Sequence, residues 1–126
     1  MDGQTEGRAM TYAVNQDQDG VLHVRISGLM HVADQRGIQA AIAGLPKDEG
    51  GLRVVAELDD FRGWEKDEAW GDLGFLLDNG NRVARMALVG EERWRERALM
   101  FVGKGFRSTA IEYFPGTDAA EDWVRR

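Results

Sequence analysis

The stretch Leu52–Asn81, LRVVAELDDFRGWEKDEAWGDLGFLLDNGN, decides the fold of this chain. Its first part, Leu52–Leu58, is nearly all apolar, contains adjacent β-branched residues and is too short for a helix. Such a run predicts a strand that is buried on both faces. The pair Asp59–Asp60 interrupts this pattern. We therefore expect the strand to end there and a connecting loop to follow over Phe61–Trp64.

Apolar residues return after this loop at helical spacing. They recur at intervals of three and four residues, which places them on one stripe of a helix: Ala69, Trp70, Leu73, Leu76 and Leu77. The pair Asn79–Gly80 closes the pattern, since glycine tolerates the left-handed conformation that often ends a helix. The stretch therefore predicts one strand followed by one helix.

Several aromatic residues do not fit this strand and helix. Phe61 and Trp64 fall in the expected loop, and Phe75 lies about 140° around the helix from Trp70. They indicate an apolar feature at the carboxyl end of the strand, where open α/β sheets place their sites. The predicted ligand or partner surface consists of Phe61, Trp64, Trp70, Phe75 and Leu76. The alternative is that these side chains fold back onto the core.

Gly63 lies between the two loop aromatics. We expect this position to need glycine for its backbone, either because φ is positive or because the two aromatic side chains approach each other closely. The residue is therefore predicted to be critical for the backbone of the site, and a larger side chain should destabilise the fold.

Composition limits the class of protein. The chain has 126 residues, which fits one domain, and we assign residues 1–9 to a disordered tail and residues 10–126 to a single domain. With 16 Lys and Arg against 22 Asp and Glu, the net charge of −6 argues against binding nucleic acid or an anionic membrane. The sequence shows no signal-peptide pattern and no run of about 18 apolar residues. We therefore expect a cytoplasmic protein without an integral membrane segment.

The remaining segments complete an alternating pattern. Two strands flank a turn that ends at Asp19–Gly20, which predicts a β-hairpin. After the hairpin, helices and strands alternate to the end of the chain, which predicts an α/β fold. We expect a mostly parallel sheet of about five strands with an antiparallel N-terminal hairpin. Right-handed crossovers between neighbouring strands would put the helices on one face.

Four motifs carry a resemblance to a known family. They are LDDFRGW at 58–64, AWGDLGF at 69–75, RMALVG at 85–90 followed by Trp94, and IEYF at 111–114 with Trp123. In these motifs, and nearly throughout from Tyr12 onward, the chain resembles the SpoIIAA-like proteins of the STAS-domain superfamily, which are small bacterial α/β domains. The resemblance implies the same mostly parallel sheet, with helices along one face.

The resemblance implies a binding or regulatory function. The best-known STAS proteins antagonise anti-sigma factors and are switched by phosphorylation of a serine near the start of the central helix. Residues 59–67 contain neither Ser nor Thr, so this switch is not carried over to that segment. Related proteins have been likened to lipid-carrier domains, which implies a carrier or sensor of a small nonpolar ligand.

A protein-interaction module is the alternative. In that case the aromatic residues would form a homodimer interface or the surface for a protein partner, and we expect a homodimer. Arg62 beside Trp64 suits such a surface, because Trp and Arg are enriched among the residues that dominate binding energy. The sequence leaves pocket, interface and core open for the aromatic residues.

Residues that could support catalysis are scarce. The chain has no cysteine, and neither serine lies in a nucleophile motif. His23 falls on the polar side of a strand and His31 at a helix entry, so both are expected to face solvent. Glu57, Asp59 and Asp60 are expected to cap the next helix rather than bind a metal. We therefore expect no enzymatic activity, no metal and no cofactor.

Overall fold

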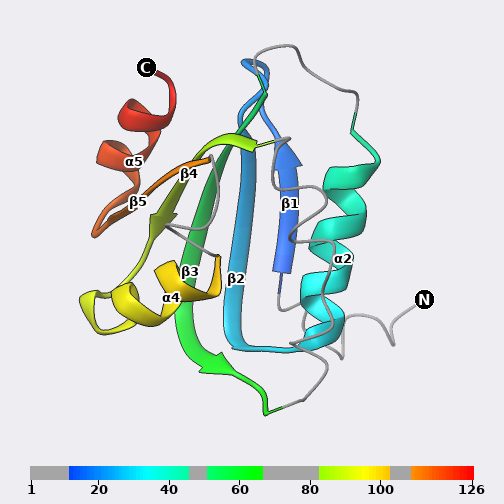
Figure 1. The fold of residues 1–126 in the computed structure, drawn as a ribbon, viewed down its shortest axis with the longest axis vertical. Coiled ribbons are helices and arrows are strands. Elements are labelled where there is room, and N and C mark those ends of the chain that lie inside the picture. The colour runs from blue at the N-terminus through cyan, green and yellow to red at the C-terminus, as the bar shows by residue number, and fades with distance from the viewer. Residues whose placement is uncertain (1–11, 46–50, 67–82, 103–108) are drawn as a thin grey trace, which may run out of the picture.

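The computed structural model describes residues 12–45, 51–66, 83–102 and 109–126. Five strands form one sheet in the order β1-β2-β3-β4-β5 (Figure 1). The strands are β1 (Tyr12–Gln16), β2 (Leu22–Met30), β3 (Leu52–Trp64), β4 (Val83–Val89) and β5 (Ala110–Phe114). The helices are α2 (Val32–Ala43), the 3-10 turn η3 (Glu92–Trp94), α4 (Arg95–Phe101) and α5 (Thr117–Val124).

The pairing of the strands confirms the predicted fold class. β1 is antiparallel to β2, and β2, β3, β4 and β5 are parallel to their neighbours. The predicted N-terminal tail and the predicted helix of residues 69–77 lie outside the described residues. No helix in the described ranges is long and apolar enough to cross a membrane.

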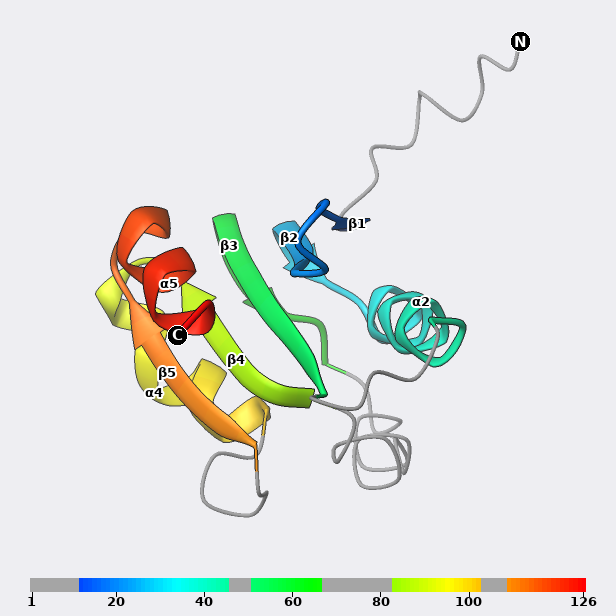
Figure 2. The ribbon, with the colours of Figure 1, turned by 90° about the horizontal axis from the view of Figure 1, so that it is seen from above.

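Helices cover both faces of the sheet. Because side chains alternate along a strand, Val54 of β3 lies in one hydrophobic cluster and Val55 in another. Ile42 of α2 and Ala98 of α4 belong to the first cluster, whereas Val124 of α5 belongs to the second. Figure 2 shows α2 beside β1 and β2, and α5 against the other end of the sheet.

The position of α5 departs from the predicted arrangement of helices along one face. That prediction rests on the handedness of crossovers between parallel strands. α5 follows β5, and the described residues include no strand after it, so no described crossover constrains its face.

β3 continues through the segment that the sequence predicts as a loop. Its pairing with β2 shifts register on both sides of Gly28, so Asp60 and the residue before Gly63 have no partner on β2. Each extra residue in a strand reverses the face to which the following side chains point. The two irregularities therefore turn both Phe61 and Trp64 toward the face covered by α2 and α4. The predicted loop at 61–64 is wrong, because the two aspartates mark a bulge and not a strand end.

The end of β3 also fixes the start of α2. The backbone N–H of Glu65 donates to the carbonyl of Met30 at 2.9 Å. The Glu65 carboxylate accepts from the backbone N–H of Val32 at 2.8 Å, and the Asp34 carboxylate accepts from that of His31 at 2.8 Å. Carboxylates in these positions satisfy free N–H groups and stabilise the positive end of the helix dipole. The start of α2 is therefore bound to Glu65, the residue that directly follows β3.

Arg125, directly after α5, is bound to the turn between β1 and β2. Its guanidinium donates to the carboxylates of Asp17 and Asp19, at 2.8 Å each. Asp17 also lies 2.9 Å from Nε2 of His23 and accepts from the backbone N–H groups of Val21 and Asp19. Partial burial raises the pKa of the Asp17 carboxyl, but the hydrogen bonds outweigh it and hold this pKa well below its usual range.

We expect Gly63→Ala to lower the free energy of unfolding by about 1–3 kcal/mol. Gly63 has φ of 105°, a conformation that other residues adopt only with strain. A Cβ atom at this position would lie 3.4 Å from the Trp94 ring, which is an ordinary contact. The loss should therefore come from the backbone. Urea denaturation measures it.

Gly44→Ala is the matched control for this substitution. Gly44 has φ of −80°, and a Cβ atom there would lie 3.6 Å from the nearest neighbouring atom. This variant should keep the stability of the parent protein to within about 0.5 kcal/mol. Equal losses in the two variants would contradict a special role for the Gly63 backbone.

We expect Asp17→Asn to destabilise the protein at neutral pH and to matter less in acid. A carboxyl whose folded pKa lies below its unfolded value of about 3.9 stabilises the fold above that pH. This contribution decreases as the pH falls toward the folded pKa. Because the side chain is partly exposed, we expect a difference of no more than about 1 kcal/mol at neutral pH.

Urea denaturation between about pH 7 and pH 2 tests this prediction. Asp122→Asn serves as the control, because this exposed carboxylate pairs with Arg126 one helical turn away and does not connect separate elements. A difference between Asp17→Asn and the parent that stays constant over the whole range would show that the charge of Asp17 is not responsible.

Candidate functional site

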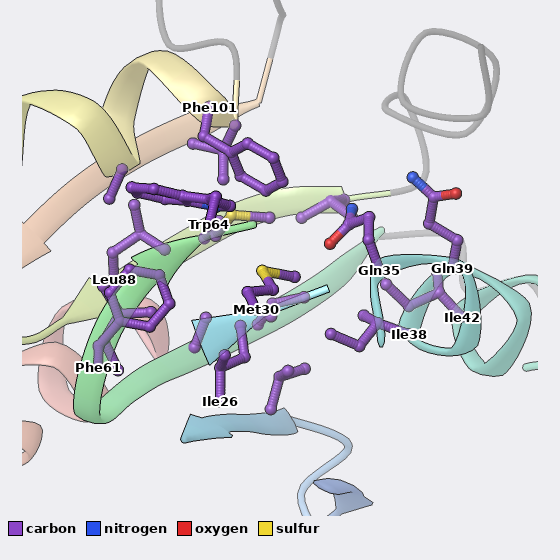
Figure 3. Close-up of a pocket in the computed structure, with 18 residues that line it drawn as sticks. Ile26, Met30, Gln35, Ile38, Gln39, Ile42, Phe61, Trp64, Leu88 and Phe101 are labelled. Carbon is purple, nitrogen blue, oxygen red and sulfur yellow. The ribbon is translucent and has the colours of Figure 1, made fainter. Parts of the chain in front are cut away.

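An apolar cavity of about 110 Å³ lies between the sheet and the helices α2 and α4 (Figure 3). Val54 and Ala56 of β3 line it from the sheet, Ile38 lines it from α2, and Ala98 lines it from α4. β2 and β4 contribute further apolar side chains, including those of Met30 and Leu88. The cavity therefore lies within the larger of the two hydrophobic clusters.

Aromatic rings form the end of the cavity near α4. Phe61 contacts Trp64 and Trp94 edge to face, with ring centroids 4.9 and 5.0 Å apart, and Trp64 lies 6.0 Å from Trp94. Phe101 of α4 lies 5.4 Å from Trp64 on the other side. Rings in these geometries stabilise each other beyond the burial of their surface. The arrangement fixes Phe61 and Trp64 in the cavity wall.

The structure brings together part of the predicted site. Phe61, with an exposed fraction of 2%, and the half-buried Trp64 both line the cavity. Gly63 lies between them in β3, and its positive φ agrees with one of the two reasons expected for a glycine there. The two aromatic side chains on either side of it also approach each other closely, with ring centroids 4.9 Å apart. The predicted site residues Trp70, Phe75 and Leu76 lie outside the described residues.

Sequence analysis did not identify the two glutamines of α2 that line the cavity. Gln35 and Gln39 are 8% and 5% exposed, and both belong to the cavity wall. Figure 3 shows them across the cavity from Trp64, with Met30 between. The spacing of the two glutamines could have identified them in the sequence. Gln35 and Gln39 are one turn apart and share the helix face of Ile38 and Ile42.

Two buried N–H groups of the cavity residues lack an acceptor. Within the part of the chain that the structure describes, neither Nε2 of Gln39 nor Nε1 of Trp64 makes a hydrogen bond. The same holds for Nε1 of Trp94, which is not among the cavity-lining residues. Most buried polar groups in native proteins are paired, so these donors need an explanation.

The polar residues considered for catalysis lie away from the cavity. His23 is bound to Asp17, and Nδ1 of His31 lies 3.2 Å from the carboxylate of Asp34. The three acidic residues considered for a metal lie in a separate cleft of about 610 Å³, together with Glu91 and Glu92. These three are Glu57, Asp59 and Asp60.

Three carboxylates of this acidic cleft have cationic neighbours. Asp59 lies 3.9 Å from Arg25, Glu91 lies 3.4 Å from Arg93, and Glu92 lies 2.6 Å from Arg95. No group of three or more potential metal ligands occurs among the residues in the four described ranges. The cavity is therefore the better candidate site.

The fold and the cavity together define a small α/β domain with a mixed five-stranded sheet and an apolar cavity against one of its faces. A family model described as SpoIIAA-like matches residues 21–125, and the chain belongs to this family. The predicted resemblance is therefore confirmed. As a member of this family, the chain is a STAS-like module of the binding or regulatory kind.

Solved structures agree with this assignment of the fold. An uncharacterized protein with a SpoIIAA-like fold from Shewanella loihica PV-4 is 23% identical, with a TM-score of 0.66 over 90% of this chain and 91% of that chain. The Bacillus cell fate determinant SpoIIAA, solved in its phosphorylated form, is 15% identical, with a TM-score of 0.55 over 90% of this chain and 99% of that chain. No curated protein matches the chain.

We expect Phe61→Ala to cost about 3–5 kcal/mol of the free energy of unfolding. Phe61 is almost completely buried and contacts two tryptophan rings, so its removal leaves a space that the surrounding rings cannot fill. Met100→Ala is the control, because Met100 lies on the neighbouring helix but is 75% exposed. The variant Met100→Ala should lose no more than about 0.5 kcal/mol of the free energy of unfolding. Thermal and urea denaturation measure the stability of both variants. Equal stability of Phe61→Ala and Met100→Ala would contradict this prediction.

Proposed function

We propose that this protein is a non-enzymatic binding module that carries or senses a small nonpolar ligand in the cavity between the sheet and the helices α2 and α4. One observation carries the proposal: the cavity has an apolar wall into which β3 turns two aromatic side chains, Phe61 and Trp64. Apolar pockets with a few polar groups are the usual form of small-molecule sites.

The size of the cavity limits the ligand. Its volume of about 110 Å³ is smaller than the roughly 300–1,000 Å³ of most drug-sized sites. A designed cavity of about 150 Å³ in another protein is sufficient to hold benzene. The cavity therefore suits a small molecule of about one ring, or the end of a lipid-like alkyl chain. A complete lipid would need additional space outside it.

The chemistry of the cavity wall supports binding rather than catalysis. None of the described residues that line it is an acid, a base or a nucleophile. Proton transfer and covalent catalysis need such groups within hydrogen-bond reach of the reacting atoms. We further propose that the protein acts in the cytoplasm, in agreement with the lack of cysteine in the chain.

A protein-interaction module is the second candidate. Leu29 and Met100 are the large hydrophobic residues exposed on the described part of the chain, at 39% and 75%. Met100 directly precedes Phe101, which lines the cavity, so a partner bound at α4 could respond to a ligand. In this proposal the protein acts as a homodimer, or binds another protein, through the surface around α4.

We expect Ala98→Leu to abolish binding of a small apolar probe such as benzene. Ala98 is 2% exposed and lines the cavity, so a leucine side chain would occupy the space that the ligand needs. Ala40→Leu is the matched control, because Ala40 is an exposed residue of α2 and the same atoms are added outside the cavity. Titrations followed by NMR compare benzene binding to the parent and to both variants.

Native mass spectrometry of these three proteins and of Met100→Glu distinguishes the two candidate functions. Binding of benzene to the parent and to Ala40→Leu, but not to Ala98→Leu, supports the ligand-binding module. A dimer that Met100→Glu converts to monomers, without benzene binding, supports the interaction module. Benzene binding that Ala98→Leu leaves unchanged would show that the cavity is not the site.

A further inference from the structure

Two of the three buried donors without an acceptor belong to the wall of the cavity. These are Nε2 of Gln39 on α2 and Nε1 of Trp64 on β3. Gln39 is 5% exposed, so bulk water does not reach its amide freely. An apolar residue at either position would pack against the same neighbours without leaving a buried N–H group unpaired. The sequence instead has a donor on each side of the cavity (Figure 3).

A purely hydrocarbon ligand would leave these donors unpaired. Sites that present buried hydrogen-bond donors favour ligands with a matching acceptor, because the donors remain unpaired when an analogue lacks it. Gln35 adds a second buried amide one turn before Gln39, in the same wall. The glutamine side of the cavity is therefore its polar end, and the aromatic rings of Phe61 and Phe101 form apolar parts of the wall.

The acceptor should be neutral. None of the described lining residues is Lys, Arg or His, so a carboxylate or phosphate in the cavity would have no cationic partner there. Burying an unpaired anion is far more costly than burying a carbonyl group that accepts hydrogen bonds. A ketone, an ester or an amide meets the requirement, and a free fatty acid with its carboxylate inside the cavity does not.

We infer that the ligand is a neutral carbonyl compound with a small apolar body, and that one of the two unpaired donors, Nε2 of Gln39 or Nε1 of Trp64, donates a hydrogen bond to its oxygen. The inference rests on the proposed function, because it assigns the chemistry of a ligand in the same cavity. It differs in what it requires: the proposed function needs only an apolar molecule to bind, whereas this inference needs the oxygen to be recognised.

A pair of matched probes tests the recognition of the oxygen. Cyclohexanone and methylenecyclohexane have similar shapes, but the second carries a CH₂ group in place of the carbonyl oxygen. NMR titration of the parent protein should show about tenfold tighter binding of the ketone. The N–H resonance of the donor, either the indole of Trp64 or the side-chain amide of Gln39, should shift with the ketone and much less with the alkene. The indole resonance of Trp94 is an internal control, because Trp94 does not line the cavity.

Variants show which of the two donors is responsible for the preference. Trp64→Phe keeps an aromatic ring and removes the N–H group, and Gln39→Met keeps a long side chain and removes the amide. The variant that lacks the donor should lower the ratio of ketone affinity to alkene affinity several-fold, and the other variant should keep this ratio. Gln18→Met, in the exposed turn between β1 and β2, should leave the preference unchanged. If Gln39→Met does not fold, Trp64→Phe and the resonance shifts of the parent protein still decide the question.

The outcomes separate this inference from the proposed function. Equal affinity for the ketone and the alkene would overturn the inference and leave the proposed function standing, and water would then be the partner of the two donors. A preference for the ketone that persists in both variants would also overturn it, since another group would then recognise the oxygen. If neither probe binds, the proposed function fails together with the inference.

Discussion

The extension of β3 past its two aspartates is the constraint on which the rest of the structure depends. A regular strand would alternate its side chains and could not direct Phe61 and Trp64 to one face, since they are three residues apart. The two register shifts against β2 make this possible, with positive φ at Asp60 and Gly63. The strain of this backbone is offset by the aromatic packing with Trp94 that it permits.

The two faces of the sheet differ in the size of their side chains. On the α5 side the buried residues are small, with Val55, Ala87 and Ala120 at 0% exposure, and the helix lies close to the strands. On the other side, large rings and long side chains from α2, α4 and the strands do not fill the space between them. Close packing on one face thus stabilises the domain, while the other face can accommodate a cavity.

Local patterns predicted the order of elements and the identity of two site residues, but not how the site is built. Phe61 and Trp64 were identified because they did not fit the expected strand and helix. The segment that contains them was nevertheless interpreted as a loop. A bulge cannot be distinguished from a strand end by periodicity, because one extra residue reverses the alternation. The register shift becomes visible only in the pairing with Gly28, which is distant in sequence.

The glutamines of α2 were missed for a different reason. Gln35 and Gln39 share the apolar face of their helix, but glutamine is mostly exposed in proteins and was not counted as part of that face. Their burial depends on how α2 packs against the sheet, which the residues of the helix alone do not show. The face on which α5 packs was likewise not predictable from handedness, because no crossover to a following strand occurs in the described residues. Trp70, Phe75 and Leu76 lie outside the described residues, so their assignment to the site stays a prediction.

The ion pairs of Arg125 have a consequence for the kinetics of folding. They join residues 106 and 108 positions apart, so they close nearly the whole described chain into one loop. Contacts of such long range form late, because the loss of chain entropy must first be offset by the sheet. An interaction absent from the transition state acts on the rate of unfolding and hardly on that of folding. Arg125 should therefore prolong the lifetime of the native state, because its ion pairs form only after both ends of the domain have folded.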